Sequence, residues 1–146
     1  MLVFALVGCG GSPTTDLDAT GMVQALAKQG LPVTLTVTYT ASNDPNKLLG
    51  RPNSYTSKAS FTDQRVDPAK VQGGKQGDVN LGGNVEVFAT ADDAAARAAL
   101  LKESAEKVPT LAEYSYAKGP VVVRVSKELM PADALEYEGA LGKLVQ

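Results

Sequence analysis

The sequence predicts an α+β domain, a two-layer sandwich in which a mostly antiparallel sheet of about five strands carries its helices on one face. Two patterns predict this class. Apolar residues recur at helical spacing in separate segments, and the runs between them alternate apolar and polar residues with the period of a strand. The expected order is α-β-β-β-α-β-β-α, and strands that follow one another directly favour antiparallel pairing.

The first half of the chain supplies one helix and three strands. The helix is expected to end at Gly30, before Pro32. A strand with one buried and one wet face follows, because three apolar residues alternate with threonines: Leu35, Val37 and Tyr39. A longer strand is expected over 54–66 and another over 84–88. In the longer strand Lys58 is expected on one face, and on the other face Tyr55, Ala59 and Phe61.

The second half supplies two helices and two strands. A helix is expected over 92–107, and Pro131 begins the last one. Between them, strands over 111–117 and 121–126 are joined by a Gly-Pro turn. We expect the inward faces of all these elements to form one core, which contains Leu35, Val37, Tyr39, Phe61, Leu101, Val123, Tyr137 and Leu141.

The chain opens with a pattern typical of bacterial lipoproteins. Leu6-Val7-Gly8-Cys9 matches a lipobox, in which a signal peptidase cuts before the cysteine and the thiol takes up lipid chains such as palmitate. The basic n-region is missing, since the first charged residue is Asp16. Either the start lies inside a longer signal peptide, or residues 1–7 are an ordinary buried strand. The small residues after Cys9 suit a tether and favour the lipobox.

These signals divide the chain into three parts. Residues 1–9 are the signal-peptide remnant with the lipobox, 10–17 form a flexible tether, and 18–146 form a single α+β domain. Lipidated Cys9 is then the first mature residue. It would anchor the protein to the extracytoplasmic face of the cell membrane.

Composition narrows the function. The chain has no histidine, which excludes Ser-His-Asp and Cys-His catalysis and the usual zinc sites. Fourteen Lys and Arg face sixteen Asp and Glu, without a basic run, so we expect no nucleic-acid partner. We also expect no metal, no cofactor and no enzymatic activity. The scattered carboxylates are weak candidates for an acid–base pair: Asp63, Asp67, Asp78 and Glu86.

The segment from Asp44 to Lys58 is the candidate functional motif. Its turn-forming residues predict a shaped surface loop, in which Arg51 could pair with Asp44 to fix the loop ends. In the alternative interpretation the loop binds a partner through an exposed patch. The candidate binding residues are Asp44, Asn46, Arg51, Tyr55 and Lys58.

From Asp44 to Asp63 the chain carries the pattern DPN-x-LLGRP-x-x-Y-x-SK-x-x-F-x-D. In this it resembles a family of uncharacterised exported proteins and lipoproteins from actinobacteria and other Gram-positive bacteria. The likeness continues through Gly82 to Phe88 and Val121 to Ser126, so it covers most of the chain after Leu31. The resemblance implies a shared fold and an extracytoplasmic setting, and it implies no known activity.

Three function classes follow from these observations. The first is a membrane-tethered binding module that contacts an envelope component through the Asp44–Lys58 segment. The second is an interference lipoprotein encoded by a phage or prophage, which blocks infection or inhibits an exported enzyme, with an envelope or phage protein as partner. The third is a cell-envelope enzyme that works without histidine. We expect the first.

The lipobox makes a direct prediction about localisation. When the chain is expressed behind a complete signal peptide, it should fractionate with membranes, and Cys9→Ser should release it into the soluble fraction. Several acyl chains exceed the marginal binding of a single one, which is the physical reason. Membrane association that survives Cys9→Ser would contradict the lipobox interpretation.

Overall fold

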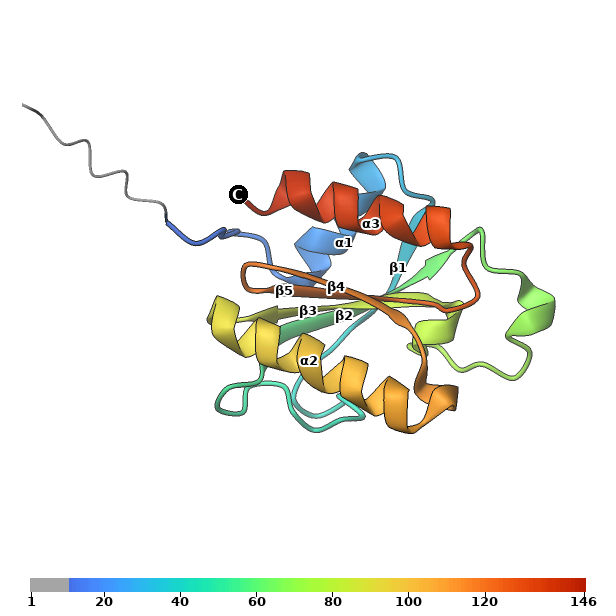
Figure 1. The fold of residues 1–146 in the computed structure, drawn as a ribbon, viewed down its shortest axis with the longest axis horizontal. Coiled ribbons are helices and arrows are strands. Elements are labelled where there is room, and N and C mark those ends of the chain that lie inside the picture. The colour runs from blue at the N-terminus through green and yellow to red at the C-terminus, as the bar shows by residue number, and fades with distance from the viewer. Residues whose placement is uncertain (1–10) are drawn as a thin grey trace, which may run out of the picture.

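The computed structural model describes residues 11–146, which form three helices and one five-stranded antiparallel sheet (Figure 1). The α+β class and the expected order of elements are confirmed. The lipobox and Cys9 lie outside the described residues. In chain order the elements are α1 (Ala19–Lys28), β1 (Val33–Thr38), β2 (Tyr55–Asp63), β3 (Gly82–Phe88), α2 (Ala91–Lys107), β4 (Tyr114–Lys118), β5 (Val121–Val125) and α3 (Pro131–Leu144).

Local sequence chemistry fixes the helix starts. The carboxylate of Asp18 caps α1 by accepting from the N–H of Gly21 at 2.7 Å, and the Thr90 hydroxyl caps α2 by accepting from the N–H of Asp93 at 3.1 Å. Pro131 begins α3 without a side-chain cap. Among residues 11–146, no helix combines the length and apolar character needed to cross a bilayer.

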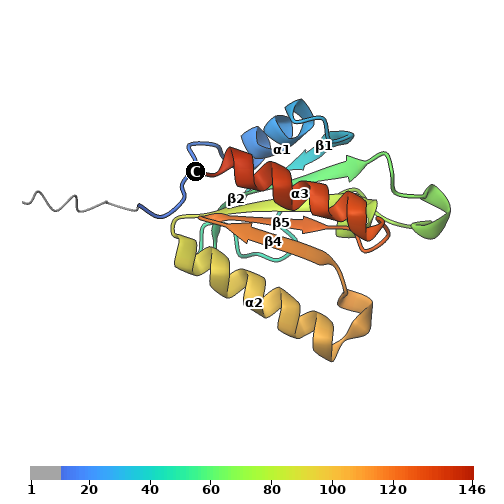
Figure 2. The same ribbon diagram turned by 45° about the horizontal axis from the view of Figure 1, so that its top comes forward.

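The helices cover both faces of the sheet, so the expectation of helices on one face is wrong. The strand order is β1-β2-β3-β5-β4. Helices α1 and α3 pack on one face and α2 lies on the other (Figure 2). Alternate valines of β5 explain why: Val121 and Val123 join the core under α1 and α3, whereas Val122 packs with Ala94 of α2. Because both faces carry buried apolar residues, each needs a cover.

A β-bulge corrects the expected facing of the first strand. Leu35 pairs with Phe61, but Val37 pairs with Ser60, so Thr36 is an extra residue in β1. One inserted residue turns every later side chain to the opposite face. Leu35 therefore packs against the core of α1 and α3, while Val37 lies on the α2 face with Ser60.

The expected single core is accordingly divided. Five of its predicted residues pack under α1 and α3: Leu35, Phe61, Val123, Tyr137 and Leu141. Leu101 belongs to a smaller cluster under α2, which contains Tyr55 and Phe88. Val37 and Tyr39, both half-buried, lie beyond the bulge.

The start of the described chain is attached to the domain. The N–H of Thr14 donates to the carbonyl of Gln146 at 2.9 Å, and the N–H of Gln146 donates back at 3.1 Å. Thr14 lies inside the segment expected to be a flexible tether, so these two bonds fix that part of the tether to Gln146. The chain therefore enters the domain beside its own last residue (Figure 1).

The core predicts the effect of truncating α3. Leu141 is 1% exposed, and Leu141→Ala should lower the free energy of unfolding by about 2–5 kcal/mol because it leaves a cavity. Leu135 lies on the same helix at 56% exposure, and Leu135→Ala should change stability by less than about 0.5 kcal/mol. Urea denaturation measures both, and equal losses would contradict the packing of α3.

Candidate functional site

A second β-bulge creates a polar cluster on the α2 face of the sheet. Tyr55 pairs with Phe88 and Ser57 with Val87, which leaves Thr56 as the extra residue in β2. Tyr55 and Lys58, three residues apart, consequently share one face. The expectation that they lie on opposite faces is wrong, because strict alternation holds only where the ladder is unbroken.

The carboxylate of Asp44 is the centre of this cluster and is buried. It accepts the hydroxyl of Tyr55 at 2.7 Å and the ammonium of Lys58 at 3.4 Å. Backbone N–H groups of its own loop donate as well, from Leu48 at 2.9 Å and Leu49 at 3.1 Å. One side chain thereby fixes the turn of the loop to the face of the sheet.

These contacts shift the pKa values of the cluster. Burial alone would raise the pKa of Asp44, but the hydrogen bonds from Tyr55, Leu48 and Leu49 and the charge of Lys58 lower it to about 2. Burial and the bond to Asp44 raise the pKa of Tyr55. Burial lowers the pKa of Lys58, against the opposing effect of Glu86 and Asp44.

The buried ammonium of Lys58 also lies against two aromatic rings. Its nitrogen is 4.8 Å from the ring centroid of Tyr39 and 5.4 Å from that of Tyr55. Both distances suit cation–π attraction. The bulges in β1 and β2 make this arrangement possible, because each turns one of the two tyrosines onto the α2 face.

A second charged network lies beside the first, under α2. Glu86 of β3 is fully buried and accepts two bonds from Arg97 of α2, at 2.8 and 2.9 Å. Arg124 of β5 donates to Glu86 at 3.3 Å and forms a bidentate pair with Glu113 at 2.7 and 3.0 Å. Two arginines and two glutamates therefore neutralise each other.

A cleft opens over this network. Its volume is about 370 Å³, and it lies between α2, the loop that follows β1, and the short turns before β3 and β4. Arg97 and Arg124 form part of its wall, together with Leu101 and Leu111. Four further lining side chains are uncharged and polar, Asn46, Asn80, Ser104 and Thr110, and two carry carboxylates, Asp78 and Glu113.

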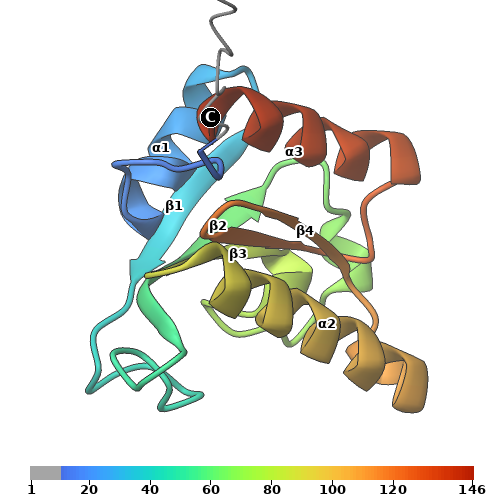
Figure 3. The ribbon, with the colours of Figure 1, turned by 60° about the vertical axis from the view of Figure 1, so that its left-hand side comes forward.

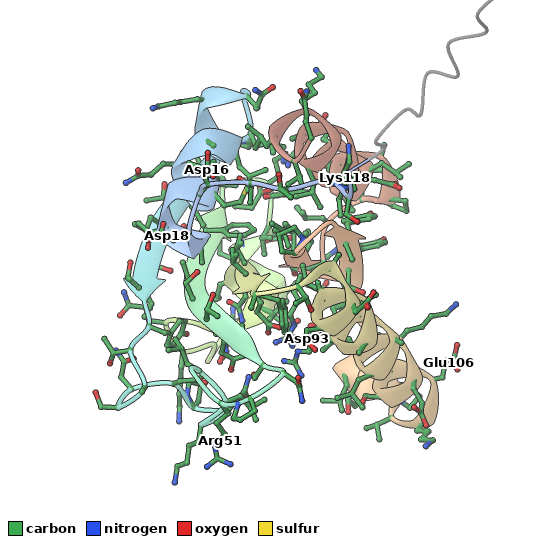
Figure 4. All side chains as sticks on the ribbon, turned by 90° about the vertical axis from the view of Figure 1, so that its left-hand side faces the viewer. Asp16, Asp18, Arg51, Asp93, Glu106 and Lys118 are labelled. Atoms are coloured by element: carbon green, nitrogen blue, oxygen red, sulfur yellow. The ribbon has the colours of Figure 1, made fainter. Side chains whose placement is uncertain are left out.

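The candidate binding residues of the motif are divided between the interior and the surface. Tyr55 and Lys58 are buried, which contradicts an exposed patch that they would share with Asn46 and Arg51, and Asp44 is buried as well. Asn46 is exposed, lines the cleft and donates to the hydroxyl of Tyr55 at 3.3 Å. Arg51 extends into solvent at the end of the loop (Figure 4).

The expected pairing of Arg51 with Asp44 is wrong as well. Lys58 takes that place, because it faces the α2 side beside Glu86 and its ammonium reaches the carboxylate of Asp44. Figure 3 shows this loop, which follows β1, on the same side of the sheet as α2. The loop therefore completes the second face at the end of the sheet where the motif lies.

The carboxylates considered for acid–base work are not gathered in one place. Asp63 accepts from Arg65 and from the hydroxyl of Tyr137, on the face covered by α1 and α3. Glu86 lies on the α2 face and is held by two arginines. Asp78 lines the cleft beside those arginines and accepts from the N–H of Lys75, whereas Asp67 is exposed elsewhere. Among residues 11–146, no group of three or more His, Cys, Asp or Glu is arranged to hold a metal ion.

Sequence reasoning missed the network around Glu86 although its signal is present. Lys58, Glu86 and Arg124 each interrupt a strand that is otherwise rich in buried residues. A charge at a central strand position requires a partner when both faces of the sheet are covered.

Comparison of the chain with protein-family models, with curated proteins and with solved structures finds no match in any of the three. The resemblance of the Asp44–Asp63 pattern to exported lipoproteins therefore stays a prediction.

The Asp44 cluster predicts a sharp contrast within the motif. Asp44→Asn should lower the free energy of unfolding by about 3–5 kcal/mol, because it leaves the buried charge of Lys58 without its partner. Arg51→Ala, in the same loop, should change stability by less than about 0.5 kcal/mol. Chemical denaturation measures both variants. A large loss from Arg51→Ala would show that the loop is held differently.

The lowered pKa of Asp44 also predicts a dependence of stability on pH. The folded-state pKa, about 2, lies below the ordinary value of 3.8. The stabilising contribution is therefore complete above about pH 4 and is lost as the pH falls toward 2. The stability difference between the wild type and Asp44→Asn should shrink over this range. A stability difference that stays constant from about pH 6 to about pH 2 would contradict the assignment, because this range reaches from above the ordinary pKa of Asp44 to its folded-state pKa.

Proposed function

We propose that the protein is a membrane-tethered extracytoplasmic lipoprotein that acts as a binding module and takes an uncharged sugar unit of the cell envelope into the cleft beside α2. The cleft is the observation that carries this proposal. It combines a volume of about 370 Å³ with a wall of polar side chains set on a rigid sheet and helix.

The polar groups of the cleft suit hydroxyl and amide partners. The hydroxyls of Ser104 and Thr110 and the amide of Asn80 line it, and within the described residues none of the three side chains bonds to another protein group. Arg97 bonds to Glu86 through two of its nitrogens, which leaves its third nitrogen for a ligand. Hydroxyls and amides both donate and accept, as the hydroxyls of a sugar do.

The charge balance of the cleft favours a neutral ligand over an anion. Both arginines are paired with glutamates, Arg97 with Glu86 and Arg124 with Glu113. An anion would have to compete with these carboxylates in a site with little net positive charge. The same pairing occupies both glutamates, which supports binding rather than acid–base catalysis.

The position of the cleft suits a tethered protein. The chain enters the domain at Thr14, beside the hydrophilic start of α2, where Ser12, Pro13 and Asp92 line one small hollow. The cleft is lined by the second half of the same helix, at Leu101 and Ser104. A helix of 17 residues is about 25 Å long. An anchor at Cys9 would therefore leave the cleft accessible from the side away from the membrane.

The proposal predicts that filling the cleft abolishes binding. The soluble domain should bind N-acetylglucosamine or its β-1,4-linked disaccharide, as measured by saturation-transfer NMR and by amide shifts of residues that line the cleft. Ser104→Leu should reduce affinity at least about tenfold by occupying the space, while leucine keeps α2 helical.

Glu103→Leu provides the matched control. It introduces the same side chain one position earlier on α2, at an exposed residue that does not line the cleft and whose ion pair with Lys107 is on the surface. It should leave affinity unchanged. Failure of both sugars to shift any residue of the cleft, or equal binding by Ser104→Leu, would overturn the proposed function.

A further inference from the structure

The two edges of the sheet differ in how they are protected. At the β1 edge the bulge at Thr36 breaks the ladder, and the side chain of Gln76 donates to the Thr36 carbonyl at 2.9 Å. At the other edge all five residues of β4 pair with β5 without a bulge. Natural edges are usually blocked by bulges, prolines or inward charges. Within its five residues β4 has neither a bulge nor a proline, and its one charge, Lys118, lies at the strand end with its ammonium donating to the Gly142 carbonyl of α3 at 2.8 Å.

Two residues of β4 present their backbone groups outward. In β5 the carbonyl of Pro120 accepts from Phe88 of β3, and the N–H of Ser126 donates to Gly82, so even-numbered residues bond toward β3. The odd-numbered residues of β5 therefore bond to β4, where they oppose Tyr114, Tyr116 and Lys118. This leaves the N–H and C=O groups of Ser115 and Ala117 pointing away from the sheet.

A groove lies on each side of this edge. The groove against α2 has a volume of about 570 Å³, and its helical wall includes Ala98, Leu101 and Ala105. The groove against α3 has a volume of about 360 Å³ and is lined by Glu138 and Gly142 among others. The edge of β4 is thus set between two helices, with space above and below the plane of the sheet.

We propose that β4 is a docking site for an extended peptide segment of a partner protein, which adds a sixth strand to the sheet. Four backbone groups of Ser115 and Ala117 hydrogen-bond to the segment. The two partner residues opposite Ser115 and Ala117 carry apolar side chains that enter the groove against α2. The residue between them faces α3 and is polar.

The shape of the grooves favours a foreign segment over a second copy of this chain. If β4 paired with itself around a two-fold axis at Tyr116, the side chains offered to the α2 groove would be those of Ser115 and Ala117. Both are too small to fill about 570 Å³. Leucine or valine at these positions reaches further into the groove and covers more of its apolar wall, which Ala98, Leu101 and Ala105 form beside the charged Lys102 and Glu106.

Amide hydrogen exchange tests the proposal. The probe is the peptide acetyl-Thr-Leu-Thr-Val-Thr-Lys-amide at millimolar concentration, and the control peptide carries serine in place of leucine and valine. Exchange at the outward amides of Ser115 and Ala117 should slow at least about tenfold with the probe and remain unchanged with the control peptide. No slowing with the probe, or equal slowing with both peptides, would overturn the proposal.

Variants separate the edge from the rest of the surface. Ala105→Glu places a charge in the α2 groove and should weaken the probe at least about tenfold, whereas Ala96→Glu, on an exposed part of the same helix outside the groove, should not. Ala117→Pro removes one outward N–H and should act like Ala105→Glu. If it unfolds the domain, as judged by circular dichroism, Ala105→Glu alone decides.

Two further results would count against the proposal. Sedimentation equilibrium that shows a dimer dissociated by Ala105→Glu would assign the edge to a second copy. Equal binding of the probe by Ala105→Glu and the wild type would place the peptide elsewhere. Both results concern the β4 edge and not the cleft. Ser104→Leu, which fills the cleft, should leave peptide binding unchanged, so the two proposals are tested separately.

Discussion

The contact between Asp44 and Lys58 determines the second face of this domain. Lys58 lies on β2, between β1 and β3, and its ammonium is buried. The nearest strand carboxylate, Glu86, is already bound by two arginines. A buried ammonium needs a close counter-charge, so the loop must bring Asp44 onto the sheet. The turn of the loop, the position of Asn46 and one wall of the cleft all follow from that requirement.

The fold class could be predicted from the sequence, but the layers could not. Periodicity identifies strands and helices correctly because it depends on local spacing. The face that a residue occupies follows from its position along the strand only where alternation is unbroken. In β1 and β2 a bulge interrupts the alternation, at Thr36 and at Thr56. Threonine is an ordinary strand residue, so neither bulge leaves a signal in the sequence. Helix α2 could not be assigned to its own face because the valines of β5 show that both faces need cover but not which helix supplies it.

The motif was located by its sequence, whereas the roles of its residues were not. Arg51 and Lys58 both offer a cation to Asp44, and sequence distance alone favours the nearer Arg51. The structure reverses that choice, because Lys58 faces the loop from the sheet, beside Tyr55 that the bulge turns to the same face, whereas Arg51 lies in solvent. The buried charges of β3 and β5 were visible as interruptions of valine-rich strands, and their meaning depended on knowing that both faces are covered.

The two faces of the sheet differ in the side chains that fill them. The face under α1 and α3 is closed by apolar side chains and supplies stability. On this face Phe61 stacks on Tyr137 with the two ring centroids 5.5 Å apart. On the α2 face, charged residues occupy positions that apolar side chains could have filled. Since those charges neutralise each other, they give the cleft little selectivity for ions. They also hold the polar groups around them in fixed positions. In the function we propose, a cleft built on such a face recognises hydrogen-bond geometry rather than net charge, at the half of α2 that lies away from the entering chain.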